Sequence, residues 1–299
     1  MYVLELLIFF VAAAIQAYVG FGYAIFSIPL LLLFVGRDYQ AAVVVCNITF
    51  LLQSGIMTAS VLRHIRVIEV LAVGGLVPVG AWLTNATAFA AMDQPLIRFA
   101  FASAFGAYLI YIAQQFLRRW ESSASSASPA LDAEETPHAD SGSIPDESSE
   151  HQSRLSPVLR CFLSLLTGFV TGATGVVSGT TGPPLIAYGR FRHWDEEHIR
   201  IFLQPVFCWS ALSSCVGYWW QGHRSPSFAA LNSVVASPSV FGYAVSVALG
   251  TGLGLWLQMT SIRNKQKRDS FRWYFYQILR LLGVLMILQQ LVSWIVGNQ

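Results

Sequence analysis

Charged side chains are scarce along this chain. Only 11% of the 299 residues are Asp, Glu, Lys or Arg, against about 25% in an ordinary soluble domain. Hydrophobic residues make up 55%, and the mean hydropathy is +0.54. A soluble fold of this size needs far more polar surface than these residues supply. The composition therefore argues against a soluble domain and predicts an all-α protein that crosses a membrane several times.

Other signals are also missing. The segment Met1–Phe10 is apolar with Glu5 as its only charge, so it lacks the positive region of a signal peptide, and we interpret it as the first membrane segment. The four cysteines form no CxxC or Cys/His pattern, which favours apolar packing. An intramembrane serine protease built on Ser178 would need a nearby base, and no His or Lys is expected at membrane depth. We expect no enzyme activity, no metal and no cofactor.

One segment, Glu121–Ser153, differs from the rest of the chain. It is rich in Ser, Ala, Asp, Glu and Pro, nearly lacks large apolar side chains, and holds 8 of the 16 acidic residues. Such a segment cannot bury enough surface to offset its ordering entropy, so we predict a disordered linker. It would divide the chain into a first membrane repeat, residues 1–120, and a second, residues 154–299.

The two halves share a motif at a constant offset of 155 residues. GFGYAIFSIPLLLLF begins at Gly20 and GVVSGTTGPPLIAYG begins at Gly175. In both, a glycine cluster interrupts an apolar run, and a Pro-Leu pair at Pro29 or Pro184 precedes a basic turn. Three longer apolar segments follow each motif. Internal repeats of this kind are common in transporters.

Short helices are expected on either side of each glycine cluster. They are Leu4–Val19 with Ala24–Val35, and Pro157–Gly172 with Gly182–Gly189. Each is shorter than the roughly 20 residues of a comfortable span, so we predict two hairpins of partial helices. Full spans are predicted at Tyr39–Leu62, Val67–Met92, Pro95–Leu117, His198–Gln221, Phe228–Met259 and Trp273–Val296. A hairpin plus three spans gives an odd number of crossings, so the second half would insert upside down.

The distribution of basic residues favours these inverted repeats. With the Arg63/Arg66 turn in the cytoplasm, only Arg37, Arg98 and Arg224 of the 18 Lys and Arg residues fall outside. That bias is what the positive-inside rule expects. The topology places the linker in the cytoplasm and both termini outside, in a protein of the plasma membrane.

Backbone and hydroxyl groups, rather than charges, are the polar groups available within the spans. A half-helix that begins at a glycine break points about +0.5 charge into the interior. This arrangement binds anions without a buried cation. The strongest local pattern is Gly172–Leu185, whose glycines, hydroxyls and Pro-Pro pair predict a substrate-lining break. A GxxxG-like packing face with a kink is the alternative.

Candidate substrate-binding residues lie at the two breaks and on the following spans. At the breaks they are Gly20, Gly22, Tyr23, Ser27 and Pro29, and Gly175, Ser178, Gly179, Thr180, Thr181, Gly182, Pro183 and Pro184. On the spans they are Asn47, Thr49, Arg200 and Gln204, with Gln16 and Gln53 as further polar side chains near the same cavity. Interhelical hydrogen bonds are an equally open role for the polar side chains, and anchoring at the membrane interface is the commoner role for an arginine such as Arg200.

These motifs, the four-segment halves and the hydrophilic linker resemble the TauE/SafE family of sulfite exporters and related permeases. The second motif, SGTTGPPL, fits closely, whereas Tyr23 stands where the family usually has a further glycine after GFG. Residues that match the family motifs are Gly20, Gly22, Ser27, Pro29, Ser178, Gly179, Gly182, Pro183 and Pro184. The resemblance implies transport of a sulfur-containing or organic anion, such as sulfite, sulfoacetate or a thiosulfate-like species.

Our hypothesis is a secondary transporter that works by alternating access, with one inverted half moving against the other around a midplane site between the hairpins. An uncoupled channel or facilitator is the main alternative, because no coupling residue is visible. A membrane scaffold or assembly protein is a further one. The expected partners are a small anion and the lipid bilayer, without nucleic acid, and spans rich in small residues leave a homodimer open.

Overall fold

The computed structural model describes residues 2–89, 91, 94–126, 157–222, 239–261 and 265–297. Within these ranges the chain is almost entirely helical and contains no strand. Seven of the described helices are long and apolar enough to cross a membrane. The predicted architecture, an all-α protein with several apolar helices of membrane-spanning length, is therefore confirmed.

The helices of the first half are α1 (Tyr2–Val19), α2 (Tyr23–Leu30), α3 (Tyr39–Val61), α4 (Val67–Gly74), α5 (Val77–Thr84) and α6 (Pro95–Ser126). A π-helix (Leu31–Val35) extends α2, a 3₁₀ turn (Leu62–His64) follows α3, and a second π-helix (Asn85–Phe89) follows α5. The helices of the second half are α8 (Pro157–Ser178), α9 (Gly182–Phe191), α10 (Glu196–Gly222), α12 (Ser239–Ser261) and α13 (Lys265–Gly297).

Both glycine clusters interrupt the helices at the predicted positions. Between α1 and α2, Gly20 and Gly22 have φ angles of +99° and +111°, and Gly179, which follows α8, has a φ of +62°. Only glycine adopts this region readily. Pro183 lies in the first turn of α9, where its missing N–H group leaves no helical hydrogen bond unmade.

The first helix of each hairpin is longer than predicted. α1 and α8 contain 18 and 22 residues and are both candidate spans. The prediction that they are too short to cross a membrane is therefore wrong. α8 continues through Gly172 to Ser178 because Gly172 packs closely against α5: a Cβ there would lie 2.1 Å from the carbonyl oxygen of Val77. Gly172 thus has the packing role that was the alternative reading of this motif.

The predicted span at 67–92 is one of the seven candidate spans, as Val67–Ala88, but its helix is interrupted. α4 ends at Gly74 and α5 begins at Val77, because Pro78 has no N–H group to donate to the Gly74 carbonyl. The indole nitrogen of Trp209 on α10 donates to that carbonyl instead, at 3.0 Å. A proline break thus gives α10 an anchoring point on this span.

Other predicted boundaries lie partly outside the described residues. The expected start of a span at Phe228 is one of them, and α12 is described from Ser239. α6 continues through Ser126, into the predicted linker, and residues 127–153 are outside the described ranges. The predicted span Pro95–Leu117 is part of α6, which is not among the seven candidate spans.

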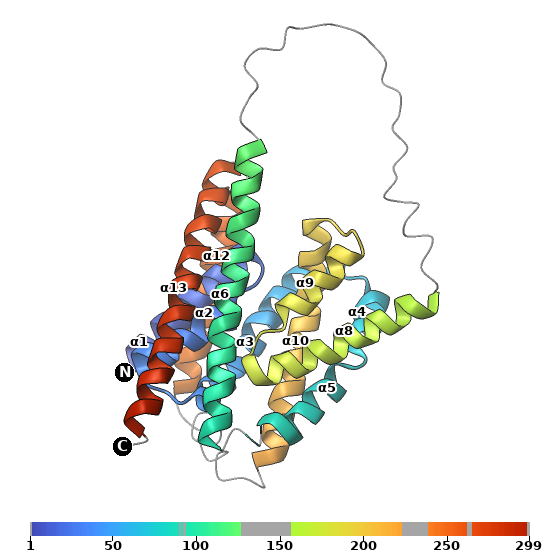
Figure 1. Ribbon diagram of the computed structural model, residues 1–299. Helices are drawn as coiled ribbons and strands as arrows, with labels where there is room; N and C mark the ends of the chain where they lie inside the picture. Colours follow the sequence, from blue (N-terminus) through green and yellow to red (C-terminus); the bar gives the residue numbers. More distant parts are fainter. Residues whose placement is uncertain are drawn as a thin grey trace, which may run out of the picture.

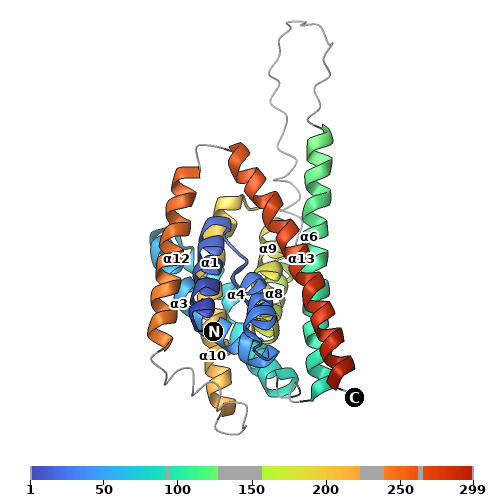
Figure 2. The same ribbon diagram turned by 90° about the vertical axis from the view of Figure 1, so that its left-hand side faces the viewer.

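Helices pack across the two halves of the chain. α1 packs against α12, while α8 packs against α4 and α5. α3 packs along α10, and α6 runs beside α13 (Figures 1 and 2). The first helix of each half therefore lies on a later helix of the other half. The inverted orientation of the halves stays a prediction.

Glycine permits these crossings. A Cβ at Gly250 or Gly254 of α12 would lie 2.2 or 2.3 Å from the carbonyl oxygens of Phe10 or Ala14 on α1. On α8, a Cβ at Gly168 would lie 1.8 Å from a carbonyl oxygen of α4. Backbones approach this closely only where no side chain separates them. These contacts fix α1 and α8, and with them the two breaks.

Candidate functional site

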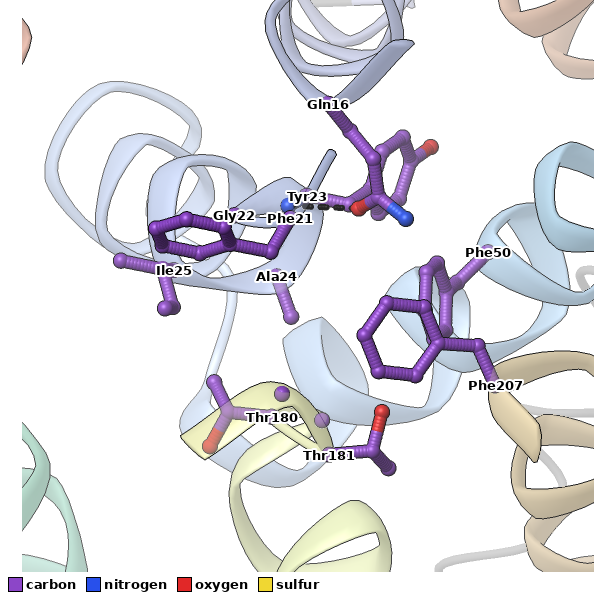
Figure 3. Close-up of a pocket in the computed structure, with 12 residues that line it drawn as sticks. Gln16, Phe21, Gly22, Tyr23, Ala24, Ile25, Phe50, Thr180, Thr181 and Phe207 are labelled. Carbon is purple, nitrogen blue, oxygen red and sulfur yellow. Dashed lines mark hydrogen bonds between the residues drawn. The ribbon is translucent and has the colours of Figure 1, made fainter. Parts of the chain in front are cut away.

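The breaks of the two hairpins touch each other. A Cβ at Gly179 would lie 3.0 Å from the Cβ of Ala24, and one at Gly182 would lie 3.7 Å from the Cβ of Phe21. In Figure 3 the segment that carries Thr180 and Thr181 lies directly across from the start of α2. Two segments that are far apart in the sequence thus form one site.

A cavity of about 20 Å³ lies between the breaks, which is room for about one water molecule. Gln16 reaches it from α1, and Thr181 lies on the opposite side (Figure 3). The rings of Phe50 on α3 and Phe207 on α10 line the cavity, with centroids 5.5 Å apart. Polar groups from the hairpins are therefore enclosed by aromatic side chains from the two central helices.

Gln16 is held in place by the start of α2. Its Oε1 accepts a hydrogen bond of 2.8 Å from the backbone N–H group of Tyr23, drawn as a dashed line in Figure 3. This bond fixes which end of the amide is the nitrogen. The Nε2 atom has no partner among the described residues, although the side chain is only 1% exposed. A buried donor without a partner costs about 1–3 kcal/mol.

The hydroxyls at the second break differ in their availability. The Oγ1 atom of Thr181 is buried without a partner in the described part of the chain. Ser178 donates to the Thr174 carbonyl at 2.9 Å, and its Oγ lies 2.5 Å from Oγ1 of Thr180. Because a carbonyl only accepts, Ser178 uses its proton there, and Thr180 donates to Ser178. Thr181 therefore has a free hydroxyl, whereas Thr180 does not.

Side chains donate hydrogen bonds to the carbonyl groups at the end of α8. The carbonyl oxygens of three successive residues accept hydrogen bonds: Gly175 from Asn47 Nδ2 at 3.2 Å, Val176 from the Tyr218 hydroxyl at 2.8 Å, and Val177 from the Tyr39 hydroxyl at 3.0 Å. The donors come from α3 and α10, the helices that lie on either side of this break.

Side chains of α10 likewise donate hydrogen bonds to the carbonyl groups at the end of α1. Gln204 donates to the Gly20 carbonyl at 3.4 Å, and Arg200 to the Ala17 carbonyl at 3.5 Å and to Gln258 of α12. The Cγ atom of Arg200 lies 3.6 Å from the Cβ position of Gly20. A cation at a helix C-terminus is favourable. Arg200 is therefore placed beside the first break rather than inside the cavity.

Most of the predicted site residues fall into three groups. Those that line the small cavity are Gly22, Tyr23, Gly179, Thr180, Thr181 and Gly182. Those at the surrounding helix ends are Gly20, Asn47, Gly175, Arg200 and Gln204. Ser178, Pro183 and Pro184 line a second cavity of about 280 Å³, between α3, α6 and the second hairpin, which Thr180 also lines.

Three predicted residues are not brought to the cavity. Ser27 donates to the Tyr23 carbonyl at 2.8 Å and lies 2.6 Å from the Cys46 sulfur. Thr49 donates to carbonyls of its own helix and lines a separate cavity between α3 and α12. Pro29 is buried inside α2. Gln53, also expected nearby, instead donates to the Ala13 carbonyl at 2.9 Å.

Sequence reasoning missed the aromatic residues of the site. Tyr39 and Tyr218 donate to the end of α8, and Phe50 and Phe207 line the cavity. The spans contain many aromatic residues, and many large apolar or aromatic side chains on these helices are exposed. No local pattern separates the inward-facing ones.

Comparison with known proteins identifies a family. A family model described as sulfite exporter TauE/SafE matches residues 5–286, which include both breaks and every residue that lines the cavity. No curated protein and no solved structure gives a significant match.

Proposed function

The chain belongs to the sulfite exporter TauE/SafE family, and from this premise we propose that it is a permease that carries a small sulfur-containing or organic anion, such as sulfite or a sulfonate. Family membership and the seven apolar helices make it an integral membrane protein. The observation that carries the proposal is a pair of buried groups, Gln16 Nε2 and Thr181 Oγ1, which have no partner among the described residues and lie at a cavity where both breaks meet.

Backbone groups support an anion as the ligand. α2 begins at the cavity, and the N–H groups of its first turn have no acceptor within the helix. Tyr23 donates to Gln16, which leaves those of Ala24 and Ile25, two residues that line the cavity. The positive end of the helix dipole lies at the same place. An anion that enters would therefore meet hydrogen-bond donors from a side chain, a hydroxyl and a helix start.

The small volume of the cavity implies a closed state. About 20 Å³ is enough for a water molecule but not for a four-atom oxyanion. Substrate entry therefore requires the two breaks to move apart. The larger cavity, which shares Thr180 with the small one, would be the route of approach.

Alternating access is the mechanism that this arrangement favours. α1 with α12, and α8 with α4 and α5, are equivalent pairs if the halves are related by a two-fold axis. The moving unit would then contain helices of both halves, because the glycine contacts bind α12 to α1. The contact between the breaks would open to one side or the other as the two units rock.

Ligand-induced stabilisation of the purified protein tests this function. Sulfite, methanesulfonate, sulfate and acetate are each titrated while the thermal unfolding of the protein is followed. Binding should raise the unfolding temperature, since a ligand at 100 times its Kd stabilises the folded state by about 2.7 kcal/mol. The absence of a shift with any oxyanion or carboxylate would contradict an anion site.

Transport by bulky variants tests the site. Ser178→Leu and Thr180→Leu should abolish uptake of the stabilising anion into proteoliposomes, because the added side chains would extend into the larger cavity that both residues line, the proposed route of approach. Membrane insertion should be unchanged. Normal uptake by both variants would make the second hairpin structural only.

An uncoupled facilitator is the second candidate function. It is favoured by the lining of the small cavity, which has no carboxylate or imidazole that could bind a coupling proton. Counterflow separates the two candidates: uptake accelerated by substrate on the opposite side supports a carrier. Ohmic single-channel currents would instead support the facilitator.

A further inference from the structure

The end of α8 is closed by hydrogen-bond donors. Tyr39, Asn47 and Tyr218 are 2%, 1% and 1% exposed, and each donates to one of three successive carbonyls at 2.8–3.2 Å. Ser178 adds a fourth bond, to the Thr174 carbonyl. The last turn of α8 therefore presents no open carbonyl from residues 174–177 to the neighbouring cavity.

If the carbonyl groups at the end of α8 were free, they would favour a cation rather than an anion. The C-terminus of a helix carries about −0.5 charge on its free carbonyl groups. In transporters with broken helices, such carbonyls coordinate cations, while the N-termini of the half-helices face anionic groups. Both kinds of helix end meet at the cavity between the breaks. The cavity therefore prefers an anion if the N–H groups of the helix N-termini are free, and a cation if the carbonyl groups of the C-termini are free.

Two of the three donors, Asn47 and Tyr218, are also bonded to each other. The Tyr218 hydroxyl gives its proton to the Val176 carbonyl, so its oxygen accepts from Asn47 Nδ2 at 3.1 Å. Asn47 also reaches the Gly175 carbonyl. α3 and α10 thus act together on the end of α8.

The Gly175 carbonyl also accepts from the backbone N–H group of Gly179 at 3.0 Å, so the carbonyls that depend on side-chain donors are those of Val176 and Val177. We propose that Tyr39 and Tyr218, with Asn47 bonded to the Tyr218 hydroxyl, set the charge selectivity of the site by occupying carbonyls that would otherwise repel an anion. They act as positioning residues, since none of them lines the small cavity. The inference rests on the anion site proposed above and names the residues that make it selective. The corresponding bonds at the end of α1, from Gln204 and Arg200, are longer at 3.4 and 3.5 Å. The donors at the end of α8 should therefore contribute more to the charge selectivity.

Removal of one hydroxyl tests the proposal. In Tyr218→Phe the Val176 carbonyl loses its donor, and in Tyr39→Phe the Val177 carbonyl does. The Kd values of methanesulfonate and sulfate are measured for each variant by calorimetry, because the two anions share a tetrahedral head but carry one and two charges. The Coulomb energy is proportional to ligand charge, so a rise of about threefold in the Kd of methanesulfonate should accompany a rise of about tenfold for sulfate.

Tyr188→Phe is the matched control. This tyrosine is also buried, but its hydroxyl bonds to the side chains of Ser164, at 2.8 Å, and Arg192, at 3.2 Å, rather than to the end of α8. Its loss should leave the ratio of the two Kd values unchanged. A merely structural contribution of Tyr39 or Tyr218 would raise both Kd values by the same factor.

The outcomes are distinct. A selective loss of sulfate affinity in either phenylalanine variant supports the proposal. If one variant does not fold, the other still tests it. Equal losses for the two anions, or no loss, overturn it while the anion site stands. If the wild-type protein binds none of sulfite, methanesulfonate, sulfate and acetate, the proposed function itself is wrong and the selectivity argument fails with it.

Discussion

Arg37 donates two hydrogen bonds to the carboxylate of Glu5, from Nε to Oε1 at 2.7 Å and from Nη2 to Oε2 at 3.0 Å. The Glu5 side chain is only 6% exposed, and Tyr243 of α12 donates to the same carboxylate. The hydrogen bonds with Glu5 raise the pKa of Arg37 above its usual value, so the arginine stays charged. The pair joins the start of α1, the loop before α3 and a helix of the second half.

Arg37→Leu should destabilise the protein by about 3 kcal/mol, because it leaves a buried carboxylate without its cation. The measurement is thermal or denaturant unfolding in detergent. Arg66→Leu is the control: Arg66 is 67% exposed and lies 3.4 Å from Glu69, and such surface pairs contribute at most about 1 kcal/mol. In a double-mutant cycle with Glu5→Gln, the two losses should not add. Similar losses for Arg37→Leu and Arg66→Leu would contradict a structural role of the buried pair.

Three glycines of α12 provide a test of close helix packing. Gly250→Ala and Gly254→Ala should each destabilise the protein by about 1–3 kcal/mol, because the added methyl group would lie 2.2 or 2.3 Å from carbonyl oxygens of α1. Gly252 lies on the same helix with nothing within 4 Å of its Cβ position. Gly252→Ala should therefore be neutral or slightly stabilising. Unfolding measurements that rank the three variants alike would mean that α1 and α12 are not in close contact.

The positions of the two breaks could be predicted because their cause is local. A positive φ angle at Gly20, Gly22 or Gly179 requires glycine, and Pro183 marks the start of the next helix. The length of α8 could not be predicted in the same way. Gly172 lies in a segment rich in glycine and hydroxyl residues, as the breaks do. It nevertheless stays within the helix, packed against the backbone of α5, which is distant in the sequence.

The partners of the polar groups could not be predicted either. Glu5 looks like an isolated charge in an apolar segment, since Arg37 and Tyr243 are 32 and 238 positions away. Tyr39 and Tyr218 are ordinary aromatic residues of apolar spans until the fold places them at the end of α8. Local sequence therefore indicated where the backbone would be free, but only the packing of the two halves shows which of its groups remain available.

The two neighbouring threonines of the second break should differ in their contribution to anion binding. Thr181→Val removes a buried hydroxyl that has no partner in the described residues, so the anion loses a hydrogen bond at no compensating gain. Bonds to charged groups contribute about 1.5–3 kcal/mol, which corresponds to a rise of at least about tenfold in the Kd of sulfite. The Thr180 hydroxyl already donates to Ser178, and a bond to the anion would replace that one, so Thr180→Val should raise the Kd less. Thr167→Val, which removes a hydroxyl bonded to the Leu163 carbonyl of its own helix, should leave the Kd unchanged. Calorimetric titration of the three variants compares them directly, and a larger effect at Thr180 than at Thr181 would place the anion on the side of the larger cavity instead.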